Sequence, residues 1–158
     1  MKIVLITVGI TNKKYLSEGI NEYQNRLNHY TNFEIIQIPN LKNTGKLSKE
    51  ELMKQEGTLI LSKVQRQTDY LVLLEERGQH YTSISFSQRI QKWMISGKKR
   101  IFFVIGGAYG FSEEVYNRGN EKLSLSKMTF SHQMVRLFFV EQLYRSYTIL
   151  NNEPYHHK

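Results

Sequence analysis

Three glycines follow a continuous apolar segment and could bring main chain close to a small ligand. Residues 101–105 read Ile-Phe-Phe-Val-Ile, and Gly106, Gly107 and Gly110 come soon after them. A continuous apolar run is typical of a strand that is buried on both faces of a parallel sheet. Glycine has no Cβ, so its backbone can approach a ligand closely. Because ligands in open α/β sheets bind at the carboxyl ends of strands, we expect a ligand site here.

The glycine pattern differs from the common phosphate-binding motifs. Residues 106–110 lack the Lys and Ser/Thr of a P-loop, and they do not read G-x-G-x-x-G. They also come late in the chain and not after its first strand. A Rossmann or NTPase assignment is therefore disfavoured. A tight strand-to-helix connection without a ligand stays open as the alternative.

A second cluster of polar and apolar side chains spans residues 126–136, between a short strand and an apolar helix. Met128 and Phe130 fit a hydrophobic core as well as a ligand contact. His132 suits either a structural hydrogen bond or proton transfer. Arg136, one turn into the helix, is expected to face a phosphate or solvent.

Apolar strands alternate with amphipathic helical segments along the whole chain. Apolar residues at three- and four-residue steps mark the helices, and Ser48 with Glu51 matches a capping box. This alternation predicts an α/β fold, with a mostly parallel sheet flanked by helices on both faces. The length suits a single domain over residues 1–158. The expected strands are 3–8, 33–38, 70–74, 101–105 and 123–126.

The ends of three expected strands should meet at one edge of this sheet. They are Leu74-Glu75, Gly106-Gly107 and Ser126-Lys127-Met128, with Glu75–Gly78 forming a charged turn. Together they offer main-chain donors and acceptors, small residues and apolar walls. Such a site suits a nucleoside-type ligand.

The last helix, expected from about Gln133 to about Leu150, is apolar over more than one stripe. Such a helix needs cover on several sides. It is either central to the domain or buried in part against a second subunit. A small α/β sheet usually covers one face of each helix, which favours the second subunit.

Composition narrows the partners and the compartment. The net charge of +8 favours a polyanion, above all nucleic acid, with a purely solubilising role as the alternative. The chain has no cysteine, which excludes disulfides, thiolate metal sites and a cysteine nucleophile, and we expect no metal. No apolar run is long enough to span a membrane, so a cytoplasmic protein without a membrane partner is expected.

Several ordered motifs resemble those of the ribosomal large subunit RNA methyltransferase H family, within the SPOUT (α/β-knot) class of methyltransferases. Shorter matches, Val8-Gly9, Glu22-Tyr23, Arg26-Leu27, Ile36–Pro39 and Glu56-Gly57, extend the resemblance over nearly the whole chain. The longer motifs are Phe103–Gly107, Leu123–His132, Arg136, Glu141–Arg145 and Pro154-Tyr155-His156.

The resemblance implies a deep trefoil knot in the C-terminal part and a homodimer. It implies S-adenosyl-L-methionine as cofactor, and methylation of N3 of a pseudouridine in a 23S rRNA stem-loop within the assembled 70S ribosome. A transfer RNA methyltransferase of the same fold and a non-catalytic ribosome-binding or assembly factor remain the alternatives. By position, the cofactor contacts carried over are Leu74, Gly106, Leu125, Ser126, Lys127, Met128, Thr129 and Phe130.

The same resemblance directs attention to the proton on N3, which must leave before the methyl group arrives. The candidates for the base are His132, Tyr155 and His156, the last two reaching the site of a partner subunit. Histidine titrates near neutral pH, which favours His156 over Tyr155. Arg136 and Arg145 are expected to bind phosphate or to orient the target base.

One position departs from the family pattern. Several relatives have Pro before the histidine of the knot loop, where this chain has Ser131. We expect this exchange to loosen the loop, because it restores backbone freedom.

Overall fold

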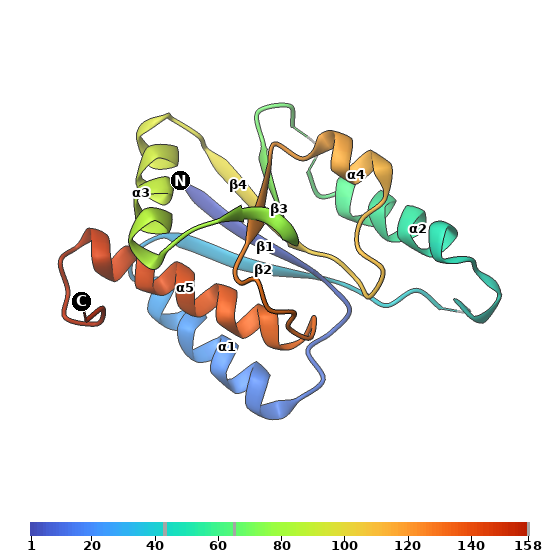
Figure 1. Cartoon of the computed structure of the whole chain (residues 1–158), viewed down its shortest axis with the longest axis horizontal. Helices are drawn as coiled ribbons and strands as arrows, with labels where there is room; N and C mark the ends of the chain where they lie inside the picture. Colours follow the sequence, from blue (N-terminus) through green and yellow to red (C-terminus); the bar gives the residue numbers. More distant parts are fainter. Residues whose placement is uncertain (43, 65, 158) are drawn as a thin grey trace.

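The computed structural model describes residues 1–42, 44–64 and 66–157. They form a five-stranded sheet with helices packed around it (Figure 1). Every paired strand is parallel to its neighbour, in the order β2-β1-β4-β3-β5. The expected parallel sheet is therefore confirmed. The strands are β1 (Lys2–Val8), β2 (Asn32–Ile38), β3 (Tyr70–His80), β4 (Arg100–Ile105) and β5 (Glu121–Ser124).

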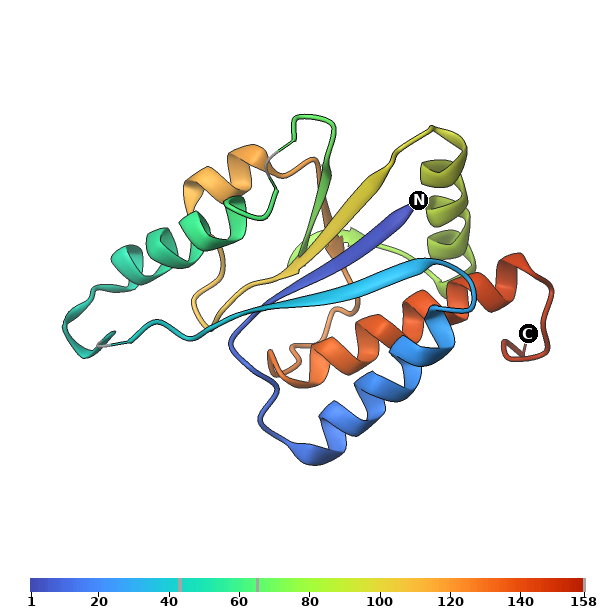
Figure 2. The same cartoon turned by 180° about the vertical axis from the view of Figure 1, so that it is seen from behind.

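Helices cover both faces of the sheet, as expected. Alternate residues of β1 and β4 face opposite sides, which divides the core in two. One face packs against α1, α3 and α5, and the other against α2 and α4. Figures 1 and 2 both show α1 beside α5, with α2 and α4 together on the far side. The helices are α1 (Lys14–Leu27), α2 (Lys49–Leu61), α3 (Ser83–Ile95), α4 (Glu113–Arg118) and α5 (Met134–Leu150).

Side-chain caps fix where several helices begin. Ser48 and Glu51 form the predicted capping box at the start of α2. The Ser112 hydroxyl accepts a hydrogen bond from the Val115 amide and begins α4. Each cap satisfies an amide of the first turn that has no partner within the helix.

Strand β3 is longer than the sequence indicated. It continues to His80, and both Leu74 and Gln79 pair with Leu123 of β5. Residues 75–78 therefore form a bulge within the strand, and the expected turn is wrong. Gly78 permits this arrangement, because a Cβ on it would lie 2.6 Å from the main-chain nitrogen of Leu123. The fifth strand also ends at Ser124 and not at residue 126.

Helix α5 obtains most of its cover from its own chain. Phe139, Val140, Leu143 and Tyr147 are buried in the core that α1 and α3 share with the sheet. Phe138 remains 38% exposed. The apolar character of α5 thus reflects a central position more than a partner surface. Among the described residues, no helix has the length and apolarity that crossing a membrane requires.

Candidate functional site

A cavity of about 430 Å³ lies where β3, β4 and β5 approach the C-terminal edge of the sheet. That volume is within the usual range for small-molecule sites. The structure brings the three predicted strand ends together around it. Of the eight predicted cofactor contacts, Leu74, Gly106 and every member of 125–130 except Lys127 line the cavity.

The glycines after β4 shape one wall of the cavity. The Gly110 amide donates to the Gly107 carbonyl oxygen over 3.2 Å, which closes a tight turn. Gly110 has φ 85°, a left-handed conformation that favours glycine. A Cβ on Gly106 would lie 3.0 Å from Cε1 of Phe111. Side chains at these positions would therefore strain the turn or crowd its neighbours.

Local hydrogen bonds hold the segment between β5 and α5, which we call the cavity loop (residues 125–132). The Ser124 hydroxyl donates to the Ser126 carbonyl oxygen over 2.8 Å. The Met128 amide donates to the Ser126 hydroxyl over 2.9 Å. At the other end, the Ser131 hydroxyl accepts from the Met134 amide over 3.1 Å. Ser131 thus accepts from the amide of the first residue of α5, and this contact opposes the loosening expected from the absence of Pro.

Two of the predicted catalytic residues, His132 at the end of this loop and Arg136 in α5, lie in different environments. His132 lines the cavity. Arg136 is 2% exposed and does not line it. Its guanidinium donates to the Val8 carbonyl oxygen over 2.7 Å and to the Thr11 hydroxyl over 3.0 Å. Burial lowers the pKa of Arg136. The expectation that it faces phosphate or solvent is therefore wrong, because the start of α5 packs against the end of β1.

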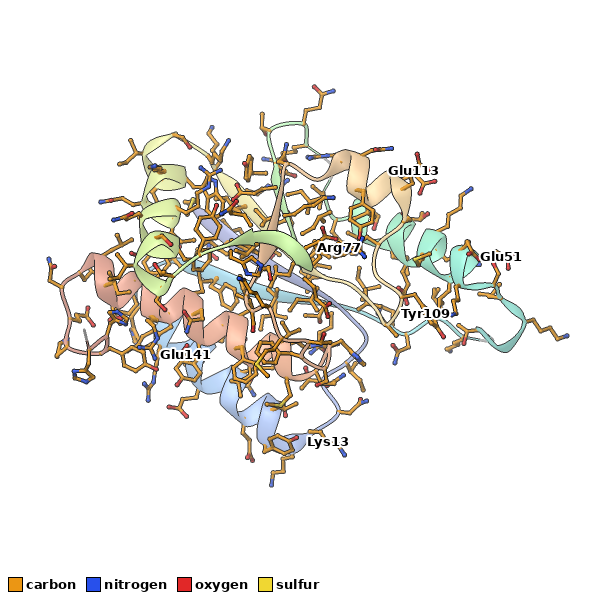
Figure 3. All side chains as sticks on the ribbon, viewed as in Figure 1. Lys13, Glu51, Arg77, Tyr109, Glu113 and Glu141 are labelled. Atoms are coloured by element: carbon orange, nitrogen blue, oxygen red, sulfur yellow. The ribbon has the colours of Figure 1, made fainter. Side chains whose placement is uncertain are left out.

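The other two predicted catalytic residues lie at the far end of α5. The Tyr155 hydroxyl donates to Glu141 over 3.0 Å and lies 3.1 Å from the Tyr23 hydroxyl. Nδ1 of His156 is 3.5 Å from a guanidinium nitrogen of Arg145. Neither Tyr155 nor His156 lines the cavity. Figure 3 labels Glu141 well apart from Tyr109, which lies between the lining residues Ala108 and Gly110.

The environment of Tyr155 bears on its proton. Burial, followed by the hydrogen bonds with Tyr23 and Glu141, raises the pKa of Tyr155. The phenol therefore remains protonated at neutral pH and donates to Glu141. In this arrangement it fixes the C-terminal tail and does not accept a proton.

Comparisons with known proteins identify the family to which this chain belongs. A family model for predicted SPOUT methyltransferases matches residues 1–156. The chain belongs to the SPOUT methyltransferase family. Relatives from Parabacteroides distasonis and Christiangramia forsetii are 56% and 58% identical over 158 residues, covering 100% of both chains. A relative from Flavobacterium johnsoniae is 53% identical over the same length. All three carry the name ribosomal RNA large subunit methyltransferase H.

This SPOUT cavity has a polar wall, of which sequence reasoning had placed Glu75 at the edge of the sheet but had missed Glu76 and Tyr116. Glu75, Glu76 and Tyr116 all line it. The Tyr116 hydroxyl donates to Oε2 of Glu75 over 2.7 Å. Burial and this hydrogen bond raise the pKa of Tyr116 to about 12, so the phenol remains a donor at neutral pH. The position of Glu75 directly after Leu74 was a usable signal, but the bulge that turns it to the cavity was not foreseen.

The charge of the wall fits the donor that a SPOUT methyltransferase needs. Among the described residues, two carboxylates and no Lys or Arg line the cavity. A sulfonium donor is cationic, so its charge and this wall are compatible. No group of three or more His, Asp or Glu that could hold a metal ion occurs in residues 1–42, 44–64 and 66–157.

Proposed function

We propose that this chain methylates N3 of a pseudouridine in a 23S rRNA stem-loop on the assembled 70S ribosome, with S-adenosyl-L-methionine as donor. The cytoplasm, where ribosomes work, is the proposed compartment. The observation that carries the proposal is the cavity built from three strand ends. The names of the relatives support ribosomal RNA as substrate, and the net charge of +8 suits a polyanion.

Holding the donor is the task of Leu74, Gly106 and residues 125–130. The donor supplies an electrophilic methyl group on a sulfonium centre. The chain contributes position, because the cavity loop is fixed by its own hydrogen bonds before a ligand arrives. The apolar side chains of Leu74, Leu125 and Phe130 exclude water from the same space.

Removing the N3 proton requires a base at the cavity. His132 lines the cavity of its own chain. His156 lies on the tail that Tyr155 fixes through Glu141, so we assign its imidazole to the cavity of a second copy. The raised pKa of Tyr155 leaves His156 the better acceptor of the two tail residues. We assign Arg145, which pairs with Glu141 and has a guanidinium nitrogen 3.5 Å from Nδ1 of His156, to orienting the target nucleotide.

A second copy of the chain has a surface to bind beside the cavity. Ile10 is 56% exposed, Met128 75%, Phe130 37% and Phe138 38%. The rings of Phe130 and Phe138 pack against each other with centroids 4.8 Å apart and planes tilted by 41°. We call these four residues the apolar rim. A homodimer that buries the apolar rim and delivers a partner's tail to each cavity completes the site.

The trefoil knot belongs to the same proposal. The cavity loop leaves β5 at the edge of the sheet, and α5 begins beside the end of β1, where Arg136 binds Val8. With strands about 4.8 Å apart, the loop crosses the ends of β3 and β4, a span of about 14 Å. Such a crossing is what a threaded C-terminal segment requires.

Label transfer tests the reaction. Purified protein is incubated with tritiated S-adenosylmethionine and with 70S ribosomes, free 23S rRNA or bulk transfer RNA. The proposal expects label in the 23S rRNA of 70S ribosomes, with mass spectrometry placing it on N3 of a pseudouridine. Label in transfer RNA would favour the transfer RNA methyltransferase. Tight ribosome binding without label would favour the non-catalytic factor.

Mixed dimers test the shared site. Gly106→Val damages the cavity, and His156→Ala damages the tail. If each tail serves the partner's cavity, mixing the two inactive variants restores about a quarter of the wild-type activity, since half of the dimers carry one intact site. If each chain uses its own tail, no mixed dimer has an intact site and activity stays absent.

A further inference from the structure

The sign of the charge around the cavity is opposite to that of the chain. The chain carries a net charge of +8, whereas Glu75 and Glu76 are the charged side chains among the residues that line the cavity. Lys127 belongs to the cavity loop but does not line the cavity. The carboxylates on the cavity lining are therefore opposite in sign to the net charge of the protein.

Glu75 holds its charge in a fixed position. Its side chain is 17% exposed, and Oε2 accepts from the Tyr116 hydroxyl over 2.7 Å. Oε1 lies 3.6 Å from Nζ of Lys122, whose side chain is 50% exposed and lies outside the cavity lining. Lys122 compensates part of the charge from the solvent side. Glu76 is exposed, so water screens its carboxylate more strongly.

We infer that Glu75 makes the cavity select a cationic methyl donor over its neutral demethylated product. The inference rests on the proposed function. S-adenosylmethionine carries a sulfonium, an ammonium and a carboxylate, with a net charge of +1 at neutral pH. S-adenosylhomocysteine lacks the sulfonium charge and is neutral. The attraction to Glu75 is therefore stronger for the donor, and a wall of this kind favours donor binding and product release.

The wall acts on binding and not on the transferred group. Methyl transfer removes the sulfonium charge, so Glu75 cannot stabilise a charge that develops at the sulfur. We therefore expect Glu75 to change the ratio of the dissociation constants of S-adenosylmethionine and S-adenosylhomocysteine. With one fixed charge roughly 10 Å from the sulfonium at an effective dielectric of about 20, that ratio should change on the order of tenfold when the carboxylate is neutralised.

Calorimetry with three ligands tests the inference without any turnover. The ligands are S-adenosylmethionine, S-adenosylhomocysteine and sinefungin, in which an amine-bearing carbon replaces the sulfonium. The wild-type chain is compared with Glu75→Gln, which retains shape and loses charge. We expect Glu75→Gln to weaken the two cationic ligands about tenfold more than S-adenosylhomocysteine. Equal weakening of all three ligands, or no weakening, would overturn the inference.

Matched variants separate charge from shape. Glu113→Gln makes the same charge change at an exposed position of α4 outside the cavity lining and should leave the selectivity unchanged. Tyr116→Phe releases the tether but retains the carboxylate, so selectivity should persist. A loss of selectivity in Tyr116→Phe as large as in Glu75→Gln would contradict the charge argument. Thermal melting confirms that each variant is folded.

The outcome also separates this inference from the proposed function. If the wild-type chain binds none of the three ligands, the proposed function fails. If it binds them and Glu75→Gln leaves their ratio unchanged, only the role of Glu75 fails.

Discussion

Nη2 of Arg136 donates a hydrogen bond to the carbonyl oxygen of Val8 over 2.7 Å. Val8 is the last residue of β1, and Arg136 stands in the first turn of α5. Nε of the same guanidinium donates to the carbonyl oxygen of His132 over 3.1 Å. Arg136 therefore joins the end of the cavity loop to the edge of the sheet, and we regard it as a positioning residue.

Replacing Arg136 should destabilise the whole chain. Arg136→Met retains much of the volume but leaves the buried Val8 carbonyl oxygen without its donor. We expect the free energy of unfolding to fall by about 2–4 kcal/mol, measured by urea denaturation. Lys14→Met, at a lysine whose side chain is 89% exposed, should change it by no more than about 0.5 kcal/mol. Equal effects of the two substitutions would contradict the assigned role.

A single methyl group at residue 78 should disturb the bulge of β3. The Cβ of Gly78→Ala would lie 2.6 Å from the Leu123 main-chain nitrogen, which cannot move without disrupting β5. We expect a loss of about 2–4 kcal/mol in the free energy of unfolding. Gly45→Ala is the control, because nothing lies within 4 Å of the added atom. A Gly78→Ala chain as stable as Gly45→Ala would show that the bulge is not this tight.

Periodicity predicted the sheet and its helices because their signals are local. Apolar runs mark β1 and β4. The capping box of Ser48 and Glu51 lies directly at the start of α2, so it can be read from neighbouring residues. The cavity was also predictable in outline, because parallel strand ends share one edge. The cofactor contacts taken from the family resemblance line the cavity at that edge, with Lys127 as the exception, whereas Arg136, Tyr155 and His156 do not line it.

Long-range packing decided what the sequence could not show. Arg136 looks like a surface cation on a helix, and its partner Val8 is 128 residues away. The bulge at residues 75–78 depends on how closely β5 approaches, so Glu75 was assigned to a turn. Tyr116 and Glu75 are 41 residues apart in the sequence, so no local sequence pattern predicts their hydrogen bond.

Filling the wall at Gly106 should remove donor binding and spare the fold. The Cβ would already lie 3.0 Å from the Phe111 ring, so the methyl groups of Gly106→Val must enter the cavity or displace that ring. We expect no calorimetric signal with S-adenosylmethionine and a melting temperature within a few degrees of wild type. Gly45→Val should bind normally. Normal affinity in Gly106→Val would place the donor elsewhere.

The half-buried carboxyl of Glu56 should make stability depend on pH. Burial raises the pKa of Glu56, so the folded chain favours the protonated form. The protonated carboxyl of Glu56 therefore contributes stability that is fully present below the pKa of the unfolded state. This stability is lost as pH rises through the pKa of the folded state. Glu56→Gln should therefore melt at a higher temperature than wild type at pH 7, with the difference vanishing near pH 4. A difference of the same size at both pH values would contradict this assignment.

Amide chemical shifts during a titration with S-adenosylmethionine test the central claim most directly. The measurement uses deuterated, ¹⁵N-labelled full-length protein, so that every affected position is observed at once. We predict the largest shifts at Leu74, Gly106 and residues 125–130, with smaller ones at the tail of the partner copy. Shifts centred instead on the separate cavity beside Thr11 and Gln37, or none at all, would contradict the account.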